Sequence, residues 1–329
     1  LRVESVAWIT ERKDVLYAFF FLLSLISYLR YRIEGRLFHY ALSLGFCLLS
    51  LLTKGLAVTL PFLLLLCDWY KGKAIDRQTL KTILPFFLLA ILFVIIAIWG
   101  QIVSNDLNQH FTWAFRILVA CWGFLFYLVK TLVPIHLSPF YAFPATTPEG
   151  LPWEFHLAPF GVLGLVILVL LSLKSCRAVV FGFGFFFLAI FPVLQLVPAG
   201  PVAAADRFTY LPAIGLSFLL SLSLDNLIRP SSFRKVLYGS AIVGMLLLSG
   251  LILTTRATCE VWKDSLSLWH RAVADAPDNY ICRSHLGTSY LEAGVPAEAI
   301  RHFSEALKIN PDYAEAYQNR GVAQMTLGN

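Results

Sequence analysis

The sequence predicts an all-α protein, with a polytopic helical membrane domain at residues 1–254 and a helical repeat array at residues 255–329. Three observations carry this prediction. Hydrophobic residues make up 58% of the 329 residues and charged residues only 14%, whereas about a quarter of a soluble domain is charged. About nine long apolar runs follow one another up to Thr254, and a period of 34 residues begins after it.

The apolar runs are interpreted as membrane-spanning helices. A bilayer core requires about 20 apolar residues per helix, and it leaves no backbone polar group unpaired, so that only helices or closed barrels cross it. The predicted spans are Val15–Tyr31, Leu37–Thr53, Leu56–Tyr70, Leu80–Gly100, Thr112–Leu132, Leu157–Leu173, Ala178–Val197, Phe208–Leu224 and Val236–Thr254.

Basic loops indicate how these spans are oriented, because Lys and Arg collect on the cytoplasmic side of a membrane. The basic loops are Arg30–Arg36, Lys71–Lys81, Lys174–Arg177 and Arg229–Lys235. The opposite, extracytoplasmic face is then expected to hold Leu1–Asp14, Lys54, Pro134–Glu154, Asp206-Arg207 and the repeat array. One conflict remains: two spans separate Lys81 from Pro134, where the charge rule requires an odd number. Either one segment there is re-entrant or the count is wrong.

The pair Asp206-Arg207 stands between two long apolar runs. In so hydrophobic a chain, an adjacent acid and base must be hydrated or paired. One interpretation is an interfacial charge pair at a helix boundary. The other is an anion site in which Arg207 contacts a phosphate and Asp206 orients Arg207 or binds a polar ligand.

Three further polar stretches are expected on the same face. Lys54 lies between two apolar runs, so it must snorkel, face a cavity or meet an acidic partner. The loop Pro134–Glu154 holds five prolines, which exclude a regular helix. Its aromatic residues suit a lid or a surface that stacks on sugars, or it is an interfacial connection. The charge-dense start, Leu1–Asp14, is a solvated lead-in or an active-site loop at the membrane surface.

The repeat array fits the tetratricopeptide pattern, whose period is 34 residues. Pro277 aligns with Pro311 and Gly287 with Gly321. A degenerate half-repeat precedes one full repeat at residues 280–313 and one truncated repeat, so further repeats are expected to follow. Stacked repeats present a concave binding surface, and we expect it to bind a protein or peptide around Arg283 and Tyr317.

Three motifs occur with this architecture. They are Val3-Glu4-Ser5-Val6-Ala7 with Arg12 and Asp14, then Leu137-Ser138-Pro139-Phe140-Tyr141, and finally Ala205–Gly215. In this combination the chain resembles the transmembrane and tetratricopeptide repeat-containing O-mannosyltransferases and their bacterial relatives, in the glycosyltransferase C superfamily. The resemblance covers nearly the whole chain. It implies transfer of a sugar from a polyprenyl-phosphate carrier to a protein or other acceptor, outside a bacterial inner membrane or inside the endoplasmic reticulum.

The resemblance also implies roles for single residues. Inverting transfer needs an acid that takes the acceptor proton and a cation that stabilises the departing phosphate. Arg207 is the first candidate for the phosphate, before Lys54 and Arg12. Glu4 could bind the sugar or support the base, and Asp206 could hold Arg207 in place or contact a metal.

The family's acidic catalytic loop and the His-Pro pair that usually precedes the Glu4 stretch are absent, and the chain begins at Leu1. We therefore expect a fragment or processed product that is inactive alone. No cofactor is indicated beyond the lipid-linked sugar as donor substrate; a divalent metal stays open but unsupported, because there is no Cys-x-x-Cys pair and no second acid beside Asp206 in the sequence.

Other functions stay open. A lipid-linked sugar transporter or flippase also needs intramembrane charges, but an internal repeat among its spans is expected and none is visible. A polysaccharide ligase or polymerase shares the many spans. A membrane-anchored repeat scaffold would need only one span. The basic balance of the membrane part, +8 against −2 in the array, indicates lipid headgroups as partners, not nucleic acid.

Overall fold

The computed structural model describes residues 2–103, 112–143, 151–197, 200, 202–228 and 234–328, with the backbone alone for residues 227–228 and 234–243. Parts of four predicted segments lie outside the described residues: Leu1 of the charge-dense start, residues 144–150 of the proline-rich loop, residues 229–233 of the last basic loop and Asn329 of the repeat array.

Helices build the membrane part, and nine of them correspond to the nine predicted spans. The first ten helices are α1 (Glu4–Ala7), α2 (Lys13–Glu34), α3 (Leu37–Thr53), α4 (Leu60–Tyr70), α5 (Arg77–Val103), α6 (Trp113–Leu132), α7 (Trp153–Leu171), α8 (Arg177–Ile190), α9 (Ala213–Ile228) and α10 (Arg234–Val261). Short 3-10 helices connect them at η1 (Ile9–Arg12), η2 (Gly55–Thr59), η4 (Phe191–Val193) and η5 (Asp206–Thr209). The prediction of an all-α chain is confirmed.

Length and apolar composition would let five helical segments of the described chain cross a membrane. These are Ile9–Glu34, Arg77–Val103, Trp113–Leu132, Trp153–Leu171 and Gly244–Val261. The remaining four predicted spans form apolar helices of 10–17 residues. One of them, α9, starts at Ala213 and not at the predicted Phe208, because η5 and Pro212 precede it and proline has no N–H to donate within a helix.

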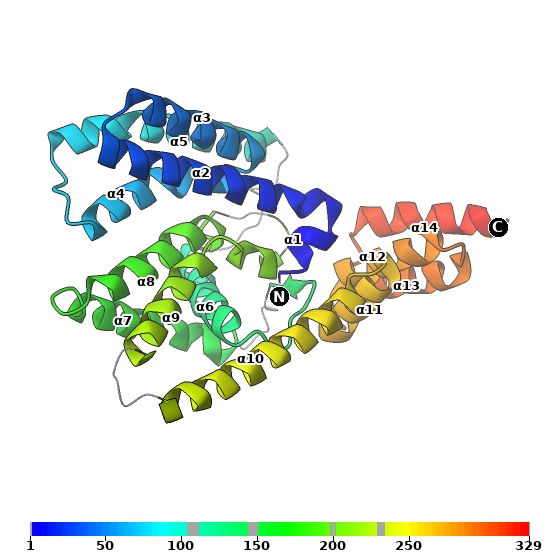
Figure 1. Cartoon of the computed structure of the whole chain (residues 1–329). Helices are drawn as coiled ribbons and strands as arrows, with labels where there is room; N and C mark the ends of the chain where they lie inside the picture. Colours follow the sequence, from blue (N-terminus) through cyan, green and yellow to red (C-terminus); the bar gives the residue numbers. More distant parts are fainter. Residues whose placement is uncertain are drawn as a thin grey trace.

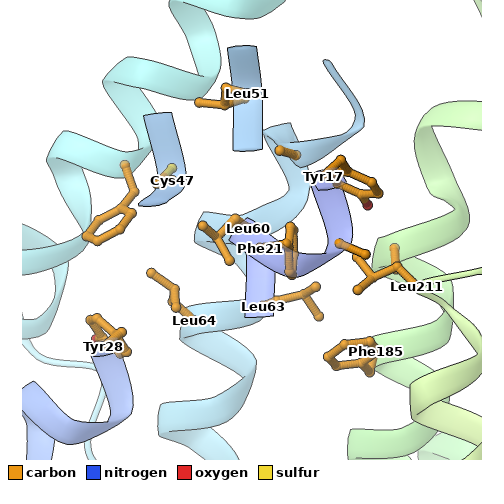
Figure 2. Close-up of a cluster of buried hydrophobic side chains, with 14 of the residues drawn as sticks. Tyr17, Phe21, Tyr28, Cys47, Leu51, Leu60, Leu63, Leu64, Phe185 and Leu211 are labelled. Carbon is orange, nitrogen blue, oxygen red and sulfur yellow. The ribbon is translucent and has the colours of Figure 1, made fainter. Parts of the chain in front are cut away.

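Helices α2–α5 form one group and α6–α9 a second group beside it (Figure 1). The contact between the groups is apolar. Tyr17 and Phe21 of α2 and Leu63 of α4 meet Phe185 of α8 and Leu211, all of them buried (Figure 2). Between helices in lipid, such contacts stabilise through close packing and not through the hydrophobic effect.

Two glycines allow α8 and α9 to touch backbone to backbone. A Cβ atom on Gly215 would lie 2.3 Å from the carbonyl oxygen of Gly182 and 2.9 Å from the nitrogen of Phe186. Small residues at helix crossings permit this approach. The crossing fixes the start of α9 at Ala213, six residues after Arg207.

A two-stranded antiparallel sheet interrupts the helices, and the sequence analysis did not predict it. Strand β1 (Tyr141–Ala142) pairs with β2 (Val202–Ala204), with Tyr141 opposite Ala204. Strands this short show no alternating pattern, and the prolines around β1 favoured an irregular loop. The sheet joins the segment after α6 to the segment before η5.

A buried polar cluster joins α2, α4 and α5 at the end of the molecule away from α1. Asp68 accepts hydrogen bonds from the hydroxyl of Tyr28 at 2.6 Å and from Nε of Arg32 at 3.1 Å. Arg32 also donates to the hydroxyl of Thr79 at 3.2 Å. The guanidinium of Arg177 lies 6.0 Å from the ring of nearby Trp69. Three predicted basic loops are therefore neighbours at this end.

The conflict over the spans between Lys81 and Pro134 persists in the structure. Helix α5 starts beside Arg32 and packs further along against η2. Helix α6 ends where the hydroxyl of Tyr127 accepts a hydrogen bond from the N–H of Ala205. Both helices thus run toward the same end, and residues 104–111 between them lie outside the described chain.

The last helices form antiparallel pairs at the end of α10 (Figure 1). They are α11 (Ser265–Asp275), α12 (Tyr280–Glu292), α13 (Pro296–Ile309) and α14 (Ala314–Leu327). A Cβ atom on Gly287 would lie 2.8 Å from the ring of Phe303, so glycine is needed where α12 and α13 approach. Phe140 and Val202 pack against Ala272 and Cys282, so the array packs against the small sheet.

We predict that Gly215→Ala lowers the unfolding midpoint in detergent, with a loss of about 1–3 kcal/mol for overpacking. The matched control is Gly45→Ala in α3, where an added Cβ meets no atom within 4 Å. It should be neutral or stabilise by up to about 1 kcal/mol, because alanine favours helix more than glycine does. Equal midpoints for the two variants would contradict the backbone contact between α8 and α9.

Candidate functional site

Three segments that are far apart in the chain bring five charged side chains together at the end of the membrane part next to α10. We call Glu4, Glu11, Asp14, Lys54 and Arg207 the charged cluster. They come from α1, from η1 and the start of α2, from the end of α3, and from η5. The orientation rule had placed all of these segments on one face.

Glu4 and Arg207 form the centre of the charged cluster. The backbone N–H of Arg207 donates to Oε2 of Glu4 at 3.0 Å, and its guanidinium donates to Oε1. Nε of Arg207 lies 3.7 Å from Oε2 of Glu11. The side chains of Glu4 and Arg207 are both largely shielded from solvent, so each charge depends on the other for compensation.

Lys54 has acidic partners, one of the three surroundings that its position between apolar runs allowed. Its ammonium group forms an ion pair with Asp14 and lies 3.3 Å from Oε2 of Glu11. The hydroxyl of Ser5 donates to Asp14 at 3.3 Å. Glu11 therefore lies between the two cations, Lys54 and Arg207.

Aromatic rings cover the two cations and connect them to α10. The guanidinium of Arg207 lies 4.9 Å from the ring centre of Phe208 and 5.4 Å from that of Trp8. Nζ of Lys54 lies 5.5 Å from Phe208. Trp8 in turn lies 6.1 Å from Trp262, which follows α10. Cations stacked on aromatic faces are stabilised most when they are shielded from water.

Asp206 does not hold Arg207, contrary to one of the two sequence-based hypotheses for its role. Both of its carboxylate oxygens accept from the hydroxyl of Tyr141, at 3.2 Å each. That hydroxyl accepts in turn from the N–H of Ser138 at 2.9 Å. Burial, and next the negative charge of Glu4, raise the pKa of Asp206 to about 7.

A cavity of about 210 Å³ opens beside Asp206. One wall comes from the proline-rich loop and α1, and the other from the end of α10 and from α11. The lining residues are Glu4, His136, Leu137, Ser138, Pro139, Asp206, Thr254, Ala257, Thr258, Val261, Trp262 and Arg271. The cavity therefore lies where the membrane part meets the repeat array, with two carboxylates and one guanidinium in its lining.

The remaining predicted site residues lie away from this cavity. Nε of Arg12 donates to the carbonyl oxygen of Val6 at 3.1 Å, and its side chain is exposed. In the array, Arg283 donates to the carbonyl of Pro277 and pairs with Glu305. Tyr317 is half exposed. Among the described residues no group of three potential metal ligands occurs.

Sequence reasoning missed two tyrosines that shape the site. Tyr127 accepts from the N–H of Ala205, and Tyr141 binds Asp206. The only signal was the place of Tyr141 in the motif Leu137–Tyr141. Burial raises the pKa of Tyr141, and the negative charge of Asp206 adds to this, so its hydroxyl stays protonated as a donor at neutral pH.

Comparison with known proteins gives a consistent family of relatives. The chain is similar to protein O-mannosyl-transferases. That of Caenorhabditis elegans, F38B6.6, is 23% identical over 216 residues, which cover 64% of this chain and 29% of the relative. TMTC4 of Mus musculus is 28% identical over 43% of this chain and 19% of its own length. Tmtc3 of Drosophila melanogaster is 26% identical over 46% and 16%.

The aligned region spans less than a third of the length of these relatives. The family described as TPR repeat matches residues 287–328, which include α13 and α14. No solved structure gives a significant match. The repeat array that the 34-residue period predicted is thus supported independently.

We predict that Lys54→Met destabilises the protein by about 3–5 kcal/mol, because it leaves a buried carboxylate without its cation. The side chain of Asp14 is only 3% exposed. The matched control is Arg36→Met, since Arg36 and Glu34 form an exposed pair at the other end, with Arg36 75% exposed. That change should cost about 1 kcal/mol or less.

The two variants are compared by their thermal unfolding midpoints in the same detergent. A loss for Lys54→Met that is no larger than that for Arg36→Met would contradict the structural role of the charged cluster.

Proposed function

We propose that this protein is a multi-pass membrane glycosyltransferase. It transfers a sugar, of the mannose type, from a polyprenyl-phosphate carrier to a protein acceptor on the extracytoplasmic side, and the cavity beside Asp206 receives the reacting groups. The observation that carries the proposal is this cavity, where a half-buried carboxylate with a pKa of about 7 lies between the membrane helices and a repeat array. The names of the relatives support the reaction class.

In this reaction the hydroxyl oxygen of the acceptor attacks the anomeric carbon of the sugar. The bond from that carbon to the phosphate oxygen breaks, and its electron pair leaves with the phosphate. A base takes the hydroxyl proton, and we propose that this base belongs to the acidic catalytic loop that the family resemblance implies. Asp206 is proposed to accept a hydrogen bond from a hydroxyl of the sugar or acceptor, which orients it for attack.

The charged cluster is proposed to hold this carboxylate in place. Glu4 binds both the guanidinium and the backbone N–H of Arg207, which is the neighbour of Asp206. The rigid position of η5 therefore depends on Glu4. In this account Glu4 and Arg207 act as positioning residues, and Asp206 makes the contact with the substrate.

The repeat array is proposed to deliver the acceptor. Arg271 of α11 and Trp262 line the cavity together with Asp206, so the array contributes directly to its wall. A polypeptide that binds along the array, around Arg283 and Tyr317, would reach the cavity without leaving the protein surface. Solenoids of this kind present extended concave surfaces to their partners.

The direct test is transfer of labelled sugar from a polyprenyl-phosphate donor to a protein acceptor by the full-length protein in lipid vesicles. We predict that Asp206→Asn lowers the rate about 10- to 100-fold, the loss expected for a hydrogen bond to a charged group. Asp278→Asn, an exposed acid in the turn before α12, should leave the rate unchanged. Absence of transfer from any lipid-linked sugar by the wild type would overturn the proposal.

The pKa of Asp206 leads to a second prediction, on pH. Transfer should increase with pH through about 7, because the ionised carboxylate accepts the hydroxyl. Tyr141→Phe removes the donor that favours the ionised form, so the pKa of Asp206 should rise further and the pH–rate profile should move to higher pH. A profile unchanged by Tyr141→Phe would contradict the role of Asp206.

The same shift affects stability. Since the folded protein holds the proton of Asp206 up to about pH 7 and the unfolded chain only to its ordinary pKa of 3.8, stability should fall as pH rises between these values. Asp206→Asn should remove this part of the pH dependence, as measured by unfolding midpoints across the range.

A further inference from the structure

An apolar groove of about 330 Å³ lies between α6 and α7, away from the cavity beside Asp206. Its lining residues recur three or four positions apart, so they lie on one face of each helix. The lining residues are Trp122, Leu125, Phe126, Val129 and Lys130 of α6 and Trp153, Glu154, Leu157 and Ala158 of α7. Both helices are long and apolar enough to cross a membrane, so the groove would face lipid.

The shape of the groove follows from one close helix contact. A Cβ atom on Gly161 would lie 2.8 Å from the end of the Leu125 side chain, so Leu125 packs directly against the backbone of α7 there. Toward Trp153 the helices leave space between them. From Trp122 to Lys130 the groove extends about 12 Å, at 1.5 Å per helical residue. This shape suits the end of one flexible hydrocarbon chain.

Lys130 stands at the open end of the groove. Its ammonium group donates to the carbonyl oxygens of Ile135 at 2.6 Å and His136 at 2.9 Å. Within the described part of the chain, no carboxylate lies at ion-pair distance from it. It lies 5.6 Å from the ring of Phe126, inside the groove.

Lys130 also lines a second, smaller cavity, together with Arg2, Thr209 and Asp206. Nε of Arg2 donates to the hydroxyl of Thr209 at 3.1 Å. Two cations that have no carboxylate at ion-pair distance among the described residues thus lie beside Asp206. In contrast, Arg207 and Lys54 are already neutralised by the carboxylates of the charged cluster.

We propose that the groove between α6 and α7 holds the isoprenoid chain of the lipid carrier and that Lys130, with Arg2, binds its phosphate. This inference rests on the proposed function and names the place of its donor. The groove and the cation pair are continuous through Lys130, and that continuity matches a molecule with an apolar chain and an anionic head.

The arrangement of charges favours one orientation of this lipid. Glu154 is exposed in the first turn of α7, where the helix dipole favours a negative charge. An anionic head is therefore repelled from the α7 side and attracted to Lys130. A phosphate held there would place its attached sugar toward Asp206, on the wall shared by the two cavities.

The experiment uses a photoactivatable polyprenyl phosphate that carries no sugar, with a diazirine in its chain, added to the full-length protein in vesicles of neutral phospholipid. Crosslinked peptides are identified by mass spectrometry. We expect labelling of α6 and α7, and competition by unlabelled polyprenyl phosphate but not by phosphatidylglycerol. Equal competition by phosphatidylglycerol would show a general lipid groove and overturn the inference.

Substitutions at two positions test the binding of the isoprenoid chain and the binding of the phosphate separately. Leu157→Trp fills the groove from an exposed position and should reduce labelling of α6 and α7 at least about fivefold by removing the site for the chain. Its control is Leu163→Trp on the same helix and outside the groove lining; the two leucines are 55% and 57% exposed. Lys130→Met should weaken binding roughly tenfold or more, through loss of a charge-assisted contact, while Lys130→Arg retains it.

The outcomes separate this inference from the proposed function, because no sugar transfer is needed for labelling. Competable labelling that maps to other helices, or that is unaffected by Leu157→Trp, would contradict binding of the isoprenoid chain in the groove. It would not contradict the proposed transferase activity. Absence of any competable labelling in a protein that still transfers sugar from this carrier would also contradict only the binding of the carrier in the groove. Absence of both labelling and transfer would overturn the carrier and the proposed function together.

Discussion

The buried ion pair between Glu4 and Arg207 is the interaction on which the arrangement of this end of the molecule depends. It joins α1 to η5 across 203 residues of sequence. Removing two charges from water is costly, and a buried pair stabilises only when further hydrogen bonds satisfy its atoms. Here the backbone N–H of Arg207 gives Glu4 a second hydrogen bond, and Glu11 and the ring of Trp8 lie beside the guanidinium, whose Nε has no hydrogen-bond partner among the described residues. As a result η5 is held in one position, and Asp206 faces the cavity.

The cations at this end divide into two classes by their partners. Arg207 and Lys54 lie among three carboxylates, so a phosphate near them would have to compete with ion pairs already formed. Among the described residues, Lys130 and Arg2 donate hydrogen bonds to neutral oxygens and have no carboxylate at ion-pair distance, and both lie beside Asp206. The first class serves to fix the helices relative to one another. The second retains the positive charge that an anionic ligand requires, which is why we place the lipid phosphate there.

The apolar runs predicted the nine helices of the membrane part, because length and composition alone decide which segments can be helical in lipid. The basic loops also predicted that Glu4, Lys54 and Arg207 would share one end. Their partners could not be predicted. Asp206 and Arg207 are neighbours in sequence, but in a 3-10 helix successive side chains point about 120° apart, so they bind different residues. Lys130 lies near the end of a predicted span, and only the packing of α6 against α7 shows the groove beside it.

The most direct test of this account is a cryo-electron microscopy structure of the full-length protein in lipid nanodiscs with a non-reactive polyprenyl-phosphate sugar bound. The account predicts the sugar beside Asp206, in the cavity that α10 and α11 complete, and the phosphate closer to Lys130 than to Arg207. Density for the sugar at the opposite end, among the basic loops near Asp68, would contradict it.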